Sequence, residues 1–178
     1  MTAAQTLLDR INVDGDINGE VIKVDRFLNH MVDPQLIDLL AAELAAAFKD
    51  QRIDKVLTAE TSGIILAQPV ARLLGVPYIY AKKKKPLTMG EFYAASSYSF
   101  TKQEATTLYV AREVLARGER LLFVDDFFAK GTTLKAIEEI SCQAGTTLVG
   151  VAVIINKSPR RDITSILTLE QLQQQNKK

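Results

Sequence analysis

The stretch Leu121-Leu-Phe-Val-Asp125-Asp126-Phe-Phe-Ala-Lys-Gly131-Thr-Thr-Leu134 decides how the rest of the chain is interpreted. Its first four residues are apolar and predict a buried strand, which ends in two adjacent carboxylates and is followed by a short loop and a helix. In an open α/β sheet, ligands bind at the carboxyl ends of the strands. Backbone N–H groups at the start of the next helix can hold a phosphate, and threonine hydroxyls add donors. Neighbouring carboxylates suit the vicinal hydroxyls of a ribose.

Two aspartates after a strand, taken alone, are more often a solvated turn that caps a helix. The complete pattern is more specific than that, because it offers grips for a sugar phosphate and for the sugar hydroxyls in one motif. It is not a Walker A loop, since the first glycine of that loop is missing and Lys130-Gly131 has the reverse order.

The sequence around this motif alternates between strands and helices. Apolar runs predict strands over residues 55–59, 76–81, 120–124 and 148–155. Helices are predicted over residues 36–48, 64–74 and 134–144, the first capped by Asp33 before Pro34, and the other two closed by Gly75 and Gly145. Such alternation predicts an α/β fold with a central, mainly parallel twisted sheet flanked by helices.

Residues 87–111 interrupt this alternation with aromatic and β-branched residues around a polar middle. They predict a hairpin with a long connection that acts as a lid, because long connections in compact domains are usually functional.

Length and composition indicate an ordinary globular chain. The 178 residues suit a single domain over 1–178, and 22 basic against 21 acidic residues give no sign of a nucleic-acid or membrane partner. The sequence shows no run of 18 apolar residues and no secretory signal, and it contains a single cysteine, Cys142. These three observations predict a cytoplasmic protein. Cys142 falls in a predicted helix and is expected to be buried, and residues 171–178 are expected to be a frayed polar tail.

The strand, acidic pair and small-residue loop together resemble the binding signature for phosphoribosyl pyrophosphate (PRPP) in the type I phosphoribosyltransferase family. Three further stretches are similar to the bacterial xanthine branch of that family, namely 24–30 (Val-Asp-Arg-Phe-Leu-Asn-His), 99–103 (Ser-Phe-Thr-Lys-Gln) and 155–158 (Ile-Asn-Lys-Ser). The resemblance runs from about residue 22 to residue 158. It implies that family's fold, with a small N-terminal hood over residues 1–32 and a flexible lid hairpin over residues 87–111. It also implies a homodimer and Mg²⁺ bound through PRPP.

The resemblance also implies roles in binding PRPP. Asp125 and Asp126 would be the catalytic pair that orients the ribose. The 5′-phosphate would be held by the loop that follows, which consists of Ala129, Lys130, Gly131, Thr132 and Thr133. The pyrophosphate would be held after the strand over residues 55–59 by Thr61, Ser62 and Gly63, with Lys82 or Lys83 from a run of four lysines. No residue is assigned to a metal directly.

The base would be read by Ile22, Asn29 and Lys157. An ammonium group near a purine carbonyl favours a 6-oxopurine over the 6-amino group of adenine. Phe127 or Phe128 could pack against a face of the base, whereas His30 is given no catalytic role.

The implied function is therefore purine salvage, in which a 6-oxopurine, with xanthine favoured, displaces pyrophosphate from PRPP to give a nucleoside monophosphate. Two alternatives stay open, a PRPP-sensing regulator without turnover and an enzyme for adenine, hypoxanthine or guanine. The chain departs from the family where Thr132 replaces a second glycine, where residues 159–161 replace a longer insertion, and in the short C-terminal region 163–172. These departures affect the shape of the base pocket, and therefore the preferred purine, but not the residues expected to bind PRPP.

Overall fold

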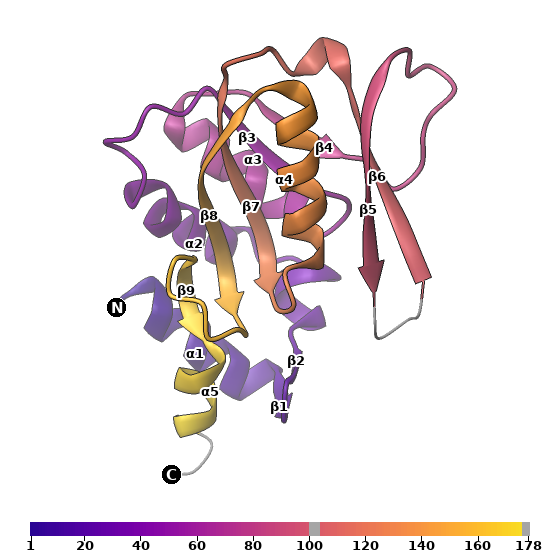
Figure 1. Cartoon of the computed structure of the whole chain (residues 1–178). Coiled ribbons are helices and arrows are strands. Elements are labelled where there is room, and N and C mark those ends of the chain that lie inside the picture. The colour runs from indigo at the N-terminus through magenta and orange to yellow at the C-terminus, as the bar shows by residue number, and fades with distance from the viewer. Residues whose placement is uncertain (100–103, 176–178) are drawn as a thin grey trace.

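The computed structural model describes residues 1–99 and 104–175, and its centre is a five-stranded parallel sheet of order β4-β3-β7-β8-β9 (Figure 1). The strands are β3 (Lys55–Ala59), β4 (Tyr78–Ala81), β7 (Arg120–Phe128), β8 (Thr147–Asn156) and β9 (Thr164–Thr168). Every pairing in this sheet is parallel. The predicted α/β class and parallel sheet are confirmed, although β9 was not expected.

Helices cover both faces of the sheet, as buried parallel strands require. In Figure 1, α4 (Thr132–Ala144) lies in front of β7 and β8, and α2 (Pro34–Ala46) and α3 (Gly63–Leu74) lie behind. The strand residues divide accordingly. Leu122 and Val124 of β7 belong to the core under α2 and α3, whereas Leu121 and Phe123 belong to the core under α4. Alternate side chains of β7 therefore point to opposite faces of the sheet and pack into two separate cores.

The N-terminal and C-terminal segments lie together at the carboxyl ends of the strands (Figure 1). They comprise α1 (Ala3–Asp14), a small antiparallel pair β1 (Asp16–Asn18) and β2 (Val21–Lys23), a π-helical turn η1 (Asp25–Asn29) and α5 (Leu169–Gln175). The predicted frayed tail is wrong for residues 171–175, because these belong to α5 and Leu172 is fully buried. Residues 176–178 lie outside the described residues.

The predicted hairpin is confirmed by β5 (Phe92–Ser99) and β6 (Glu104–Ala111), which pair from Phe92↔Ala111 to Ser99↔Glu104. Its root is fixed to the rest of the molecule at two places. Gln143 of α4 binds both the N–H and the C=O of Ala94, at 3.3 and 2.8 Å, as a neighbouring strand would. Tyr109 forms a bridge with Lys82 just beyond β4. The connection at residues 100–103, which carries the predicted lid sequence, lies outside the described residues.

Three local expectations need correction. The strand that carries the acidic pair does not end at Val124, because its ladder with β8 continues to Phe128. The next helix, α4, starts at Thr132 rather than Leu134, directly after Gly131 turns the chain with φ of 72°. Cys142 is exposed rather than buried, since it lies on the face of α4 that turns away from the sheet.

Across the part of the chain that the structure describes, no helix combines the length and the apolar character needed to cross a bilayer.

The position of β7 between the two cores predicts a large effect of truncation there. Leu122 is fully buried, so Leu122→Ala should lower the free energy of unfolding by about 2–5 kcal/mol through lost burial and the cavity it leaves. Chemical denaturation would measure this, with Leu87→Ala as the control, because the Leu87 side chain is fully exposed and its truncation should change stability by less than about 0.5 kcal/mol. Equal effects of the two substitutions would contradict the placement of β7.

Candidate active site

A cavity of about 350 Å³ lies where β3, β7 and α4 meet the hairpin. It is lined by Ala59, Glu60, Thr61, Ser62, Lys83, Thr106, Leu108, Asp125, Asp126, Phe127, Thr132 and Thr133. Seven of these were predicted as site residues from the sequence, and the structure brings them together around one space. Phe127 was named only as one of two rings that could face the base, and no role was assigned to Ala59, Glu60, Thr106 or Leu108. The last two come from β6, so the hairpin forms one wall of the cavity.

The acidic pair forms the floor of this cavity at the end of β7. Asp126 is only 9% exposed, and each carboxylate accepts the N–H of the residue that follows it: Asp126 N–H to Asp125 Oδ1 at 3.0 Å, and Phe127 N–H to Asp126 Oδ1 at 2.9 Å. Burial raises the pKa of Asp125 well above its usual value, and the charge of Asp126 raises it further, while Lys83 partly opposes this. The pair is held in place without a direct salt bridge among the described residues.

Gly63, at the start of α3, allows this floor to form. A Cβ at this position would overlap Thr58 Oγ1 and would stand 2.7 Å from Asp125 Oδ1. Only a residue without a side chain lets the turn after β3 approach the acidic pair so closely. Gly63 therefore lies behind the carboxylates and does not line the cavity itself.

The predicted pyrophosphate residues are held by a contact that the sequence did not suggest. The carboxylate of Glu60 accepts the N–H of Lys83 at 2.8 Å, and Glu60 N–H donates to Ala81 O at 3.0 Å. The loop after β3 and the loop after β4 are thus joined at the cavity, where the peptide bond between Glu60 and Thr61 is cis.

The structure also distinguishes the two candidate lysines. Lys83 is exposed and lines the cavity, whereas Lys82 places its ammonium group 5.2 Å from the centre of the Tyr80 ring and pairs with Tyr109 through its backbone. Of the two, Lys83 is the one that can meet an anion in this cavity.

The predicted phosphate loop provides the opposite end of the cavity. Thr132 and Thr133 line it as the first residues of α4, where unpaired backbone N–H groups and the helix dipole favour an anion. Gly131 precedes them in the left-handed conformation, with its Cα packed against the Phe128 ring. Ala129, Lys130 and Gly131 belong to the same loop but do not line the cavity.

None of the predicted base residues lines this cavity. Lys157 follows β8, and its ammonium group donates to the C=O of Glu20 at 2.9 Å and lies 4.7 Å from the centre of the Phe127 ring. Burial lowers the pKa of Lys157, which Glu20 and Asp126 partly offset. Since Phe127 also lines the cavity, one aromatic ring connects the acidic pair with Lys157.

The other two predicted base residues belong to the N-terminal segment. Asn29 ends η1, and its buried Oδ1 has no hydrogen-bond partner among the described residues. Ile22 is 8% exposed and packs in the core. Phe128 is also core, and Arg160 lies 5.5 Å from its ring centre. His30 is exposed and does not line the cavity.

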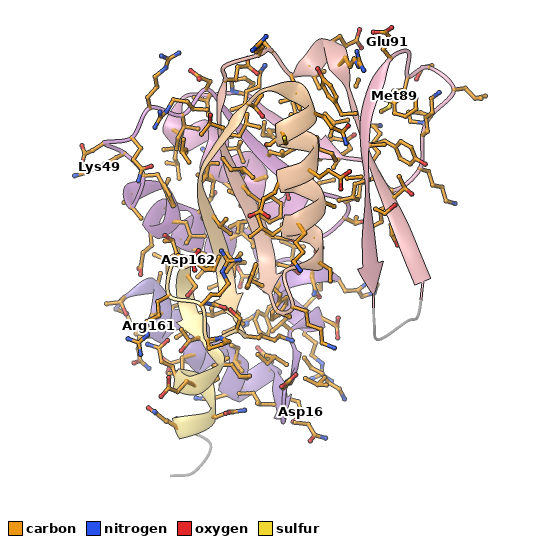
Figure 2. The ribbon with its side chains drawn as sticks, viewed as in Figure 1. Asp16, Lys49, Met89, Glu91, Arg161 and Asp162 are labelled. Carbon is orange, nitrogen blue, oxygen red and sulfur yellow. The ribbon has the colours of Figure 1, made fainter. Side chains whose placement is uncertain are left out.

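A larger cavity of about 720 Å³ opens on the other side of Lys157, between the loop after β8 and α5. Its lining includes Asn156, Arg160, Arg161 and Thr168. Figure 2 shows Arg161 and Asp162 beside β9, with Asp162 paired to Arg160. This is the region where the sequence departs from the family, so the loop after Lys157 leaves that side of the site open.

Comparison with known proteins identifies the family of this chain. The family model described as phosphoribosyl transferase domain matches residues 23–167. The chain belongs to this family. A xanthine phosphoribosyltransferase of Geobacillus thermodenitrificans is 45% identical over 154 residues, which cover 85% of this chain and 79% of that relative. One from Brevibacillus brevis is 46% identical with the same coverage.

Solved structures of the family have the same fold. An adenine phosphoribosyltransferase from Giardia lamblia, solved with 9-deazaadenine, has a TM-score of 0.76 at 22% identity, over 94% of this chain and 98% of that one. One from Rhodothermus marinus has a TM-score of 0.70 at 21% identity, over 93% and 99%. The predicted phosphoribosyltransferase fold is thereby confirmed.

The raised pKa of Asp125 predicts that this residue destabilises the fold at neutral pH. The folded state binds the proton more tightly than the unfolded state, whose aspartate pKa is about 3.9. Stability is therefore lost as pH rises from that value through the raised pKa of the folded state. Asp125→Asn, which keeps an acceptor for the Asp126 N–H, should have a higher free energy of unfolding than the wild type at pH 7, and the difference should vanish in strong acid.

Denaturation curves across pH would measure this. Asp162→Asn is the control of opposite sign, because the hydrogen bond from Arg160 lowers the pKa of Asp162. A less stable Asp125→Asn protein at pH 7 would show that Asp125 is not under electrostatic strain.

Proposed function

We propose that this protein transfers the 5-phosphoribosyl group of PRPP to a 6-oxopurine, with xanthine as the preferred base, releasing pyrophosphate and a nucleoside monophosphate. The observation that carries the proposal is the 350 Å³ cavity, in which the Asp125–Asp126 pair shares one lining with the start of α4, with the loop of Thr61 and Ser62, and with Lys83. A phosphorylated sugar with a second anion at the other end has this distribution of groups. The curated relatives, which carry the name xanthine phosphoribosyltransferase, support the choice of base.

PRPP would lie in the cavity with its 5′-phosphate toward α4 and its pyrophosphate toward the loop after β3. Its 5′-phosphate would meet the start of α4 at Thr132 and Thr133, with the loop from Ala129 around it. The ribose hydroxyls would donate to Asp125 and Asp126. The pyrophosphate would meet the loop of Thr61 and Ser62 together with the ammonium group of Lys83.

Magnesium fits this proposal as an ion that enters with PRPP. Among the described residues, no three His, Cys, Asp or Glu side chains gather into a metal cage. The ion would therefore be held mainly by pyrophosphate and ribose oxygens and by waters, beside the acidic pair. When bound, it would neutralise charge on the leaving pyrophosphate.

The reaction breaks the bond between C1 of the ribose and the pyrophosphate oxygen and forms a bond from C1 to a purine ring nitrogen, which loses its proton. By analogy with the family, positive charge develops on the ribose as the first bond breaks. Asp125 and Asp126 would hold the hydroxyls and stabilise that charge by their position. The hairpin that carries Thr106 and Leu108 would limit the access of water, which would otherwise hydrolyse the activated sugar.

The base would lie between the acidic pair and the hood. Lys157 has three N–H donors, of which one is used on the C=O of Glu20, so it can donate to a 6-oxo group without leaving its place. The unpartnered Oδ1 of Asn29 would accept an N–H of the base, and Ile22 would supply an apolar contact. Phe127 would offer a ring face. We extend the proposal to a single-domain, cytoplasmic homodimer.

The first experiment is to incubate the purified protein with PRPP and Mg²⁺ and to offer xanthine, guanine, hypoxanthine and adenine separately. We expect nucleotide and pyrophosphate to form fastest with xanthine, and the Asp125→Asn/Asp126→Asn double variant to form neither. Adenine as the best substrate would overturn the base assignment but leave the PRPP site. Binding of PRPP without turnover of any base would support the sensor alternative.

The two neighbouring lysines allow a matched test of the pyrophosphate site. Lys83→Met should raise the KM for PRPP about 10- to 100-fold, since it removes a charged hydrogen bond to the substrate. Lys82→Met should change it much less, because Lys82 lies over Tyr80 and does not line the cavity. Steady-state kinetics with PRPP varied at saturating base would measure both, and the reverse ranking would contradict the assignment of Lys83.

A further inference from the structure

The hydroxyl of Thr58 is an unexplained polar group directly behind the acidic pair. Thr58 is fully buried in β3, and its Oγ1 has no hydrogen-bond partner in the part of the chain that the structure describes. A buried hydroxyl without a partner is unfavourable by about 1–3 kcal/mol, and most proteins avoid it. Valine has nearly the same shape, and the strand is otherwise apolar here, so packing alone does not account for a threonine.

Two acceptors of β7 lie next to this hydroxyl. The position that a Gly63 Cβ would occupy overlaps Thr58 Oγ1, and lies 2.7 Å from Asp125 Oδ1 and 3.4 Å from the C=O of Val124. Thr58 Oγ1 and the Asp125 carboxylate therefore border the same small space, which stays open only because residue 63 is a glycine. The two groups are not bonded in the structure, so a hydrogen bond between them requires the carboxylate or the hydroxyl to turn.

We propose that Thr58 is a positioning residue for PRPP, whose hydroxyl donates to the Asp125 carboxylate from behind when the ribose hydroxyls bind its front. This inference rests on the proposed function, because it assigns the front of Asp125 to the ribose. The carboxylate already accepts the N–H of Asp126 at 3.0 Å. A second donor on the buried side would leave the remaining lone pairs directed at the sugar.

The surroundings of Asp125 explain why such a donor is needed. The carboxylate is shielded from water and has a second carboxylate beside it, and Lys83 is the cation that acts on it. Lys83 is also the side chain that would turn to pyrophosphate when PRPP binds. A neutral hydroxyl that donates to Asp125 once PRPP is bound would then keep the carboxylate oriented and charged.

The test compares Thr58→Val, which removes the hydroxyl but keeps the shape, with Thr58→Ser, which keeps the hydroxyl. We expect Thr58→Val to weaken PRPP binding in calorimetry with Mg²⁺ by about tenfold or more, and to lower kcat/KM for PRPP by a similar factor. The KM for the base should stay unchanged. Thr58→Ser should remain within about threefold of the wild type, since its hydroxyl can make the same bond.

Stability separates this role from a structural one. Thr58→Val should be at least as stable as the wild type, because it removes an unsatisfied buried group. Ser141→Ala is a matched control, since Ser141 in α4 is also buried, its Oγ also lacks a partner among the described residues, and it does not line the cavity. Its PRPP affinity should equal that of the wild type.

A stable Thr58→Val protein that binds PRPP and reacts like the wild type would overturn the role of Thr58 and leave the proposed function intact. Wild-type protein that does not bind PRPP would overturn the proposed function, and this inference with it. An equal loss in Thr58→Val and Thr58→Ser would also reject the role, because the hydroxyl would then not be what matters.

Discussion

The site depends on keeping two adjacent carboxylates at the end of a strand that is buried on both faces. Burial and the charge of Asp126 raise the pKa of Asp125, which the backbone N–H of Asp126 and the charge of Lys83 partly offset. The carboxylate of Asp126 is held by the N–H of Phe127. Other features accommodate the same pair. Gly63 lets the turn after β3 approach it, and Lys83 lies across the cavity. In the proposed PRPP complex, anions would bind beside the pair on loop backbone and at the start of α4, and the carboxylates would be left for neutral hydroxyls.

The parallel sheet makes this arrangement possible because it directs unrelated segments to one edge. β3, β4 and β7 run in the same direction, so the loops after them meet although they are far apart in sequence. Glu60 then joins two of these loops by accepting the N–H of Lys83. The hairpin is attached at its root to α4 through Gln143, and α4 starts at the phosphate loop. The hairpin and the proposed phosphate loop are therefore connected through a single helix.

Local signals in the sequence were sufficient to predict the helices and loops in which they occur. The cap at Asp33 before Pro34 and the left-handed glycines Gly75 and Gly145 marked helix ends that the structure confirms. The acidic pair and its loop identified the cavity. Long-range proximity could not be predicted in this way, because Glu60 meets Lys83, and Thr58 comes to border the same space as Asp125, only after the strands align. α5 was not predicted because its residues are mostly polar, although Leu172 among them is buried. The exposure of Cys142 was not predicted because only one face of α4 packs against the rest of the protein.

In the proposed assignment, base choice and PRPP binding reside in different parts of the chain, and this would explain why fold alone does not determine the substrate. Adenine enzymes at about a fifth identity have the same fold, whereas the relatives at 45% identity carry the name of xanthine enzymes. Lys157 reaches the site from the loop after β8 and is fixed by Glu20 of the hood, so its direction depends on two segments that lie outside the PRPP cavity. Changes in the hood or in the short loop after Lys157 can therefore alter the base without disturbing the acidic pair. The open 720 Å³ cavity on that side leaves room for such changes.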